Sequence, residues 1–207
     1  MLAAYRPLLR IPGALTFLGG AALARVGGAM FGVSIIVMVS SRRGSFSLAG
    51  AISAVAILVL AAAGPILGRV VDKYGQRRVV LPFAAWSTLC GLATVVLSWV
   101  DAPAWTLFVS YALSAILPEM GPLSRARWAH VFAGDPDMLH TAMSLEQVMD
   151  EASFVVGPVL GVMLATLWFP EAGLLAAFAL YFTGMVAFLS ARATEPPVVP
   201  HEDRPAG

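Results

Sequence analysis

The sequence predicts an all-α integral membrane protein with six transmembrane helices, arranged as two inverted repeats of three helices. Three observations support this fold class: the composition, six long apolar runs, and a short motif that occurs twice. Of the 207 residues, 59% are hydrophobic and only 12% are charged, whereas soluble domains carry about 25% charged residues. The mean hydropathy is +0.83. The chain is therefore expected to lie in a lipid bilayer.

Each predicted span is an apolar run of about 20 residues or more, the length that crosses a bilayer as a helix. Short polar segments that contain Arg, Asp, Gly or Pro separate these runs. β-Strands are excluded because the runs are too long and lack the period-two alternation of a membrane barrel. The six predicted spans are 12–40, 46–71, 79–100, 104–124, 140–168 and 172–192.

The two ends of the chain differ in composition. The first apolar run continues to about Ser41, far beyond the apolar core of a signal peptide, so it is interpreted as an uncleaved first span. Residues 1–192 form the predicted six-helix domain, with repeats at about 11–100 and 104–192. Residues 193–207 are rich in Pro and charge and are expected to be a disordered cytoplasmic tail or the start of a central linker.

Basic residues set the predicted orientation, because cytoplasmic loops are enriched in Lys and Arg. With the N-terminus inside, only Arg42 and Arg43 lie in an external loop. The cytoplasmic basic residues would be Arg6, Arg10, Arg69, Lys73, Arg77, Arg78, Arg125, Arg127, Arg192 and Arg204. We therefore expect a multi-pass protein of the plasma membrane with both termini cytoplasmic.

A pentapeptide repeat supports the two-repeat arrangement. The sequence GPILG at residues 64–68 recurs as GPVLG at residues 157–161, an offset of 93 residues. The same offset places spans one, two and three onto spans four, five and six. The copies are displaced by three spans, from span two to span five, so the two triplets have opposite membrane orientation, which is typical of transporter folds.

The loop between spans two and three carries a glycine-hinged, mostly basic motif. It reads Gly-x-x-x-Asp-(Arg/Lys)-x-Gly-x-(Arg/Lys)-(Arg/Lys), and its fixed positions are Gly68, Asp72, Lys73, Gly75, Arg77 and Arg78. A basic loop suits the cytoplasmic side, but orientation alone gives no reason for an aspartate within it. This motif resembles the loop between helices two and three of the major facilitator superfamily of secondary transporters.

The resemblance implies a fold and a gate. A complete transporter of that family has twelve spans with its cavity between two halves, and this chain would be the N-terminal half. The family's loop aspartate pairs with an arginine near the inner end of span four, so Asp72 is expected to contact Arg125 or Arg127. Spans one and four would line the cavity, and spans three and six would be peripheral.

A second match lies in span five. Gly157-Pro158-x-x-Gly161 resembles an element of the antiporter branch, although Val162 replaces its second glycine and Ser153 an earlier one. The segments 122–128 and 145–151 resemble those of actinobacterial members. Antiport would imply export of a small molecule.

We single out four charged residues within the apolar cores of the predicted spans: Arg25, Glu119, Asp150 and Glu151. Each would cost at least about 2.5–3.5 kcal/mol at the bilayer centre, so such groups face protein or water. Arg25 lies about 20 Å into span one, and the two adjacent acids about 15 Å into span five from the same side. We expect Arg25 to pair with Asp150 or Glu151, and favour Glu151. The pair would either carry protons or permanently fix the packing.

Three glycine pairs have the four-residue spacing that lets helices approach closely. They are Gly28 and Gly32, Gly64 and Gly68, and Gly157 and Gly161, and the last two pairs adjoin Pro65 and Pro158. By the family arrangement, the pairs in spans two and five would face a second half of the transporter.

The leading functional hypothesis is the N-terminal half of a secondary active transporter that exports a small molecule by proton-coupled alternating access. The alternatives are a truncated or non-transporting membrane protein, or a half-size transporter working as a homodimer. An intramembrane enzyme is disfavoured because no histidine lies in the interior of a predicted span and no Gly-x-Ser-x-Gly motif occurs. The expected partners are the bilayer, an unidentified small molecule, protons and a second half or copy, with no nucleic acid. No cofactor or metal is expected, since His130, His140 and His201 are scattered.

Overall fold

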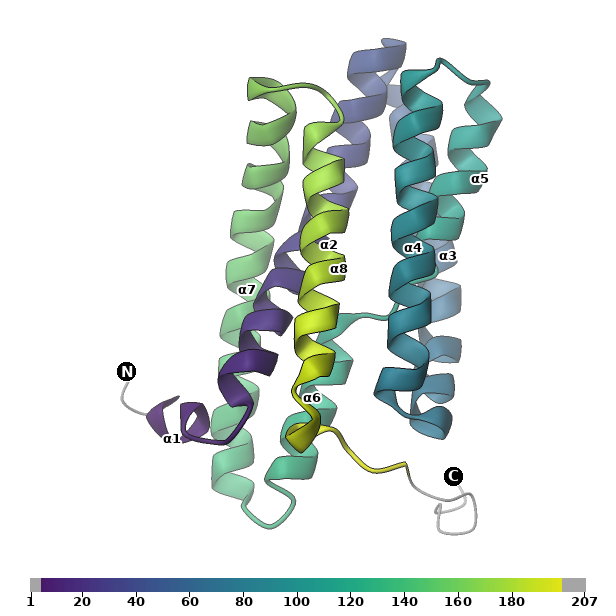
Figure 1. Ribbon diagram of the computed structural model, residues 1–207. Helices are drawn as coiled ribbons and strands as arrows, with labels where there is room; N and C mark the ends of the chain where they lie inside the picture. Colours follow the sequence, from purple (N-terminus) through teal and green to yellow (C-terminus); the bar gives the residue numbers. More distant parts are fainter. Residues whose placement is uncertain (1–4, 199–207) are drawn as a thin grey trace.

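The structure is a computed structural model that describes residues 5–198. Its long helices run side by side as an elongated bundle (Figure 1). The helices are α1 (Arg6–Leu9), α2 (Ala14–Arg43), α3 (Phe46–Tyr74), α4 (Gln76–Trp99), α5 (Ala104–Ser114), α6 (Met120–Val131), α7 (Pro136–Leu167) and α8 (Ala172–Ser190), followed by the 3₁₀ turn η2 (Arg192–Thr194). The first and last of these elements lie at the same end of the bundle (Figure 1). This end also carries the loop between α3 and α4, and we call it the basic end.

Five described helices, α2, α3, α4, α7 and α8, are long and apolar enough to cross a membrane. The prediction of a continuous fourth span over 104–124 was wrong. The helix ends at Ser114, and a new helix begins at Met120. Pro118 explains the break, because proline removes a backbone N–H and disfavours the helical conformation of the residue before it. The pairing of the helices into two inverted repeats stays a prediction.

Local signals define the helix ends. The Ser45 side chain accepts a hydrogen bond from the Leu48 amide at the start of α3, and Asp135 does the same for Met138 at the start of α7. Such caps satisfy amide groups that have no partner within the helix. The turn between α3 and α4 depends on Gly75, whose φ of +90° lies in the region that favours glycine. This glycine belongs to the basic loop motif.

The closest helix contact joins α2 and α8. A Cβ added at Gly20 would lie 2.3 Å from the Phe188 amide nitrogen, and one at Gly184 would lie 2.4 Å from the Ala24 nitrogen. These small residues let the two backbones touch. Span six corresponds to α8, which is the most buried of the five candidate spans. The prediction that this span is peripheral was therefore wrong.

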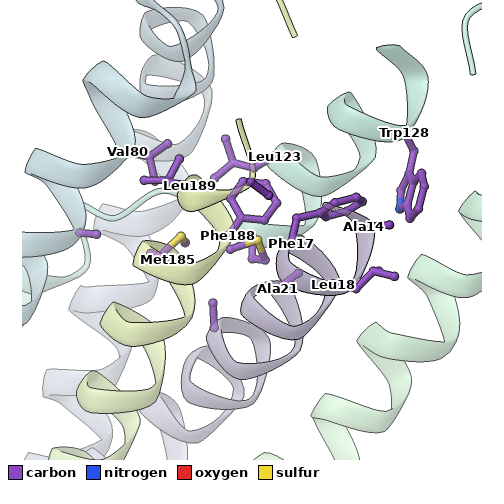
Figure 2. Close-up of a cluster of buried hydrophobic side chains, with 14 of the residues drawn as sticks. Ala14, Phe17, Leu18, Ala21, Val80, Leu123, Trp128, Met185, Phe188 and Leu189 are labelled. Carbon is purple, nitrogen blue, oxygen red and sulfur yellow. The ribbon is translucent and has the colours of Figure 1, made fainter. Parts of the chain in front are cut away.

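Aromatic packing fixes α6 to this helix pair near the basic end. Figure 2 shows the Phe17 ring between Trp128 of α6 and Phe188 of α8. The ring centroid of Phe17 lies 4.7 Å from that of Trp128 and 6.1 Å from that of Phe188, both in edge-on geometry. Such aromatic pairs contribute about 0.5–1.5 kcal/mol each beyond area burial. The second half of the broken span is therefore held in the core.

Candidate functional site

A cluster of charged side chains lies inside the bundle where α2, α6 and α7 meet. Its centre is Arg25 of α2, whose side chain is only 4% exposed. Arg25 donates through Nη2 to the Glu146 carboxylate and through Nε to Asp150 at 2.6 Å. The two acids are four residues apart on α7, so they lie on one face of that helix. One buried guanidinium is thus shared by two carboxylates.

Glu146 is the enclosed member of this cluster. Its side chain is 1% exposed. Besides the Arg25 bond, its Oε1 accepts hydrogen bonds from Ser124 Oγ at 2.7 Å and from Trp128 Nε1 at 2.8 Å. A folded protein can bury a carboxylate at acceptable cost only when hydrogen-bond donors and an opposite charge surround it. Glu146 is therefore an anchor that ties α7 to both α2 and α6.

Asp150 is the accessible member. Its side chain is 23% exposed, and its second oxygen accepts a hydrogen bond from Arg125 Nη1 at 3.0 Å. Arg125 is itself 43% exposed. One carboxylate of the cluster, that of Glu146, is therefore enclosed, whereas the ion pair of Asp150 and Arg125 reaches the surface of this chain. Its two guanidinium groups and two carboxylates balance in charge.

The expected preference of Arg25 for Glu151 was wrong. Glu151 is exposed and accepts a hydrogen bond from Gln147 Nε2 at 2.7 Å. Adjacent residues point about 100° apart on a helix, so Asp150 and Glu151 cannot both face α2. Sequence reasoning also missed Glu146, although its four-residue spacing from Asp150 would have placed it on the face that meets Arg25.

A second polar site lies at the basic end around Arg127 of α6, which is fully buried. Its Nε donates to Gln76 Oε1 at 2.9 Å, and its Nη1 donates to the Ala191 carbonyl at 2.7 Å and to Thr194 Oγ1 at 2.9 Å. The guanidinium carbon lies 3.9 Å from the Phe188 ring centroid, a cation–π contact.

Gln76 joins this site to the basic loop motif. It occupies the unspecified position between Gly75 and Arg77, yet it is buried and donates from Nε2 to the Leu123 carbonyl at 3.0 Å. The expected ion pair between Asp72 and Arg125 or Arg127 is not among the ion pairs of residues 5–198. The reason is that Arg125 turns toward Asp150 and Arg127 toward α8.

The other motif residues lie at the edge of the bundle. Lys73, Arg77 and Arg78 are exposed. The Arg77 amide donates to Glu195 Oε1 at 3.0 Å, and Lys73 Nζ lies 5.2 Å from the Tyr74 ring centroid. The glutamate contact brings the segment after α8 against the loop motif.

The expected disordered tail does not begin at residue 193. Thr194 is buried and bonded to Arg127, and residues 196–198 line a cavity. These contacts hold the first part of the segment against the bundle. The remainder of the predicted tail, 199–207, lies outside the described residues.

The cavity lies between α3, the break that separates α5 from α6, and this C-terminal segment. Its volume is about 960 Å³. Gly64, Pro65, Gly68 and Asp72 of α3 line one wall, and Glu119 lies on the opposite wall. The structure thus separates Glu119 from the other intramembrane charges, because α6 presents one face to this cavity and another to the charge cluster.

The predicted glycine pairs have different surroundings. A Cβ added at Gly28, Gly32, Gly64 or Gly68 would meet nothing within 4 Å. In contrast, a Cβ at Gly157 would lie 2.7 Å from Ala29 Cβ, and one at Gly161 would lie 2.7 Å from Ser34 Oγ. The prediction that the α7 pair faces a second half was wrong, because it packs on α2. Pro158 lies between these glycines within α7.

The comparison with protein families agrees with the loop motif and the helical bundle. A family model described as Major Facilitator Superfamily matches residues 17–206. Neither the curated proteins nor the solved structures compared with the chain match it significantly. The family match covers most of the chain, including the charge cluster, the Arg127 site and the cavity. The closer placement among actinobacterial members stays a prediction. The chain belongs to the Major Facilitator Superfamily and is a multi-pass membrane protein of the transporter type.

Proposed function

We propose that the chain is the N-terminal six-span unit of a secondary active transporter that exports a small molecule in exchange for protons. A second six-span unit, in the same polypeptide or from a second copy, would complete the alternating-access cavity. The bias of Lys and Arg toward the basic end supports a cytoplasmic position for that end in the plasma membrane. The observation that carries the proposal is the charge cluster of Arg25, Glu146, Asp150 and Arg125.

Asp150 is the proposed proton-binding group. Intramembrane acids that pair with arginine are typical of proton pathways. Of the two acids on Arg25, Glu146 is enclosed by three donors, whereas Asp150 is partly accessible. Protonation of Asp150 would remove its negative charge and weaken its hold on Arg125, which is already half-exposed. Arg25 would keep Glu146 as a counter-ion, so the change would not leave a lone buried charge.

The alternative role, a permanent ion pair that only fixes packing, is less well supported. A purely structural ion pair within a membrane is expected to be enclosed, as Glu146 is with 1% of its side chain exposed. The Asp150 side chain is instead 23% exposed and its partner Arg125 43% exposed. Water can therefore reach Asp150 while Arg25 stays paired with Glu146.

Proton exchange can be measured without knowing the substrate. The protein is reconstituted in vesicles that contain the pH dye pyranine, a pH gradient is imposed, and a library of small molecules is added. An exchanger dissipates the gradient only when its substrate is present. Asp150→Asn should abolish this response. Glu151→Gln, a matched change at the exposed neighbouring acid, should leave it intact. A wild-type response in Asp150→Asn would contradict the proposed proton site.

The requirement for a second unit leads to the other candidate function, a half-size transporter acting as a homodimer. The observation in its favour is the exposed apolar surface of α7, where Phe154, Val155 and Val159 are 56–69% exposed. Light scattering in detergent measures the molar mass of the protein and would distinguish a homodimer from a monomer. A dimer that exchanges protons supports the homodimer, and a monomer inactive in exchange would point to a separate second unit or to a non-transporting protein.

A further inference from the structure

The break in the fourth pass lies part-way along the length of the bundle (Figure 1). Non-helical backbone inside a bilayer is tolerated only where protein buries it or where it lines a cavity. The segment 115–119 meets both conditions. The Pro118 carbonyl accepts a hydrogen bond from Tyr181 Oη at 2.9 Å, and Leu117, Pro118 and Glu119 line the 960 Å³ cavity. Interrupted helices of this kind mark ligand sites in transporters.

The cavity has the size and chemistry of a small-molecule site. Such sites typically measure about 300–1,000 Å³ and are mostly apolar, with a few polar groups that fix the ligand. Ile57, Leu60 and Leu67 supply apolar wall from α3, and Leu117 supplies it from the break. The described residues that line the cavity include two acids, Asp72 and Glu119, and no basic side chain.

Glu119 is the better placed of these acids to meet a ligand. It precedes the first residue of α6, yet its side chain makes no capping hydrogen bond to that helix. It also forms no ion pair within residues 5–198. Arg125, on the next turn of α6, is held by Asp150 on the side away from the cavity. The Glu119 carboxylate is therefore available to a cation that enters the apolar cavity.

From this charge complementarity we propose that the cavity between α3 and the α5–α6 break binds a monovalent lipophilic organic cation, with Glu119 as its counter-ion. The proposal deepens the proposed function, on which it rests, by naming the substrate class. Binding at this cavity is nevertheless separable from proton exchange, because the Asp150 cluster lies on the other face of α6.

Two probes of the same shape and opposite charge test the ion pairing. Equilibrium binding of radiolabelled tetraphenylphosphonium and tetraphenylborate is measured on the purified full chain in neutral detergent. The phosphonium should bind and the borate should not compete. Glu119→Gln should weaken phosphonium binding about tenfold, the effect of one charge contact in a partly solvated site. Glu151→Gln, an acid outside the cavity, should leave it unchanged. Equal binding of both probes, or unchanged binding by Glu119→Gln, would overturn the proposal.

Two glycine-to-leucine variants, one inside the cavity and one outside it, test where the cation binds. Gly64 lines the cavity and Gly28 does not, and a side chain at either position would meet open space. Both Gly64→Leu and Gly28→Leu should therefore fold, which circular dichroism and gel filtration would check. Only Gly64→Leu should reduce phosphonium binding, by about tenfold or more. Equal effects of the two variants would place binding elsewhere.

The same variants separate this proposal from the proposed function. Asp150→Asn should bind tetraphenylphosphonium normally while losing proton exchange. If wild-type protein exchanges protons for another class of substrate and does not bind the phosphonium, the cation site is wrong and the transporter proposal survives. If the phosphonium binds through Glu119 without any proton exchange, the cation site stands and the coupling proposal fails.

Discussion

Arg125 and Arg127 lie two residues apart on α6, yet they occupy opposite kinds of site. Arg127 is fully buried, stacks on Phe188 and binds three neutral acceptors. Arg125 is 43% exposed and binds one carboxylate. Neutral acceptors do not change charge near neutral pH, so the Arg127 site should remain the same while the protein works. The carboxylate that binds Arg125 is 23% exposed and is the proposed proton-binding group, so protonation would allow the Arg125 contact to open.

The largest expected effect comes from removing the shared cation of the cluster. Arg25→Met would leave Glu146 buried without its counter-ion, which typically costs about 3–5 kcal/mol of unfolding free energy. The double variant Arg25→Met/Glu146→Gln should recover part of this loss, because it removes the uncompensated charge as well. SDS-induced unfolding in mixed micelles measures the unfolding free energy of both variants. A double variant less stable than Arg25→Met would show that Glu146 does not depend on Arg25.

The comparison of the two α6 arginines predicts the next effect. Arg127→Met would leave Gln76 Oε1 without a partner in a buried site, at about 1–3 kcal/mol, and would remove one of the two donors to the Ala191 carbonyl. Arg125→Met removes a partly exposed ion pair, and such pairs contribute about 0–1 kcal/mol. The same unfolding assay compares the variants. Equal destabilisation by the two substitutions would refute the distinction drawn between these sites.

The smallest effect concerns the contact after α8. Thr194→Val keeps the shape of the side chain but removes the oxygen that accepts from Arg127 Nη1. Because the Ala191 carbonyl still accepts from the same nitrogen, the loss should be only about 1 kcal/mol. Thr183→Val is a matched control, since Thr183 is exposed on α8 and bonds only within that helix. A larger loss in the control than in Thr194→Val would argue against the Arg127 contact.

Some parts of this arrangement could be predicted from sequence because they depend on local properties. Five spans follow from apolar length, since each must cover the same bilayer thickness. The depth of Arg25 points to α7, because the rise per residue of a helix is fixed. The rotation of α7 about its axis depends on its packing against α2, which the sequence does not show. Glu151 was therefore preferred over Asp150, and Glu146 was not considered.

Other parts depend on contacts between distant segments. Gln76 was not predicted because its position in the loop motif is unspecified, and its importance comes from Arg127, 51 residues away. The break at residues 115–119 had a local signal in Pro118, but the apolar run continues across it. The mean hydropathy of a segment does not distinguish a continuous helix from two half-helices that line a cavity.

The central claim is that the charge of Asp150 determines how accessible the Arg125 side chain is, while the Arg127 side chain stays buried. Arginine modification by phenylglyoxal, followed by mass spectrometry of the native protein, measures both side chains in one experiment. We expect Asp150→Asn to increase the modification rate of Arg125 several-fold and to leave Arg127 protected, with Glu151→Gln behaving as wild type. An unchanged rate at Arg125, or modification of Arg127 in parallel with it, would contradict the account.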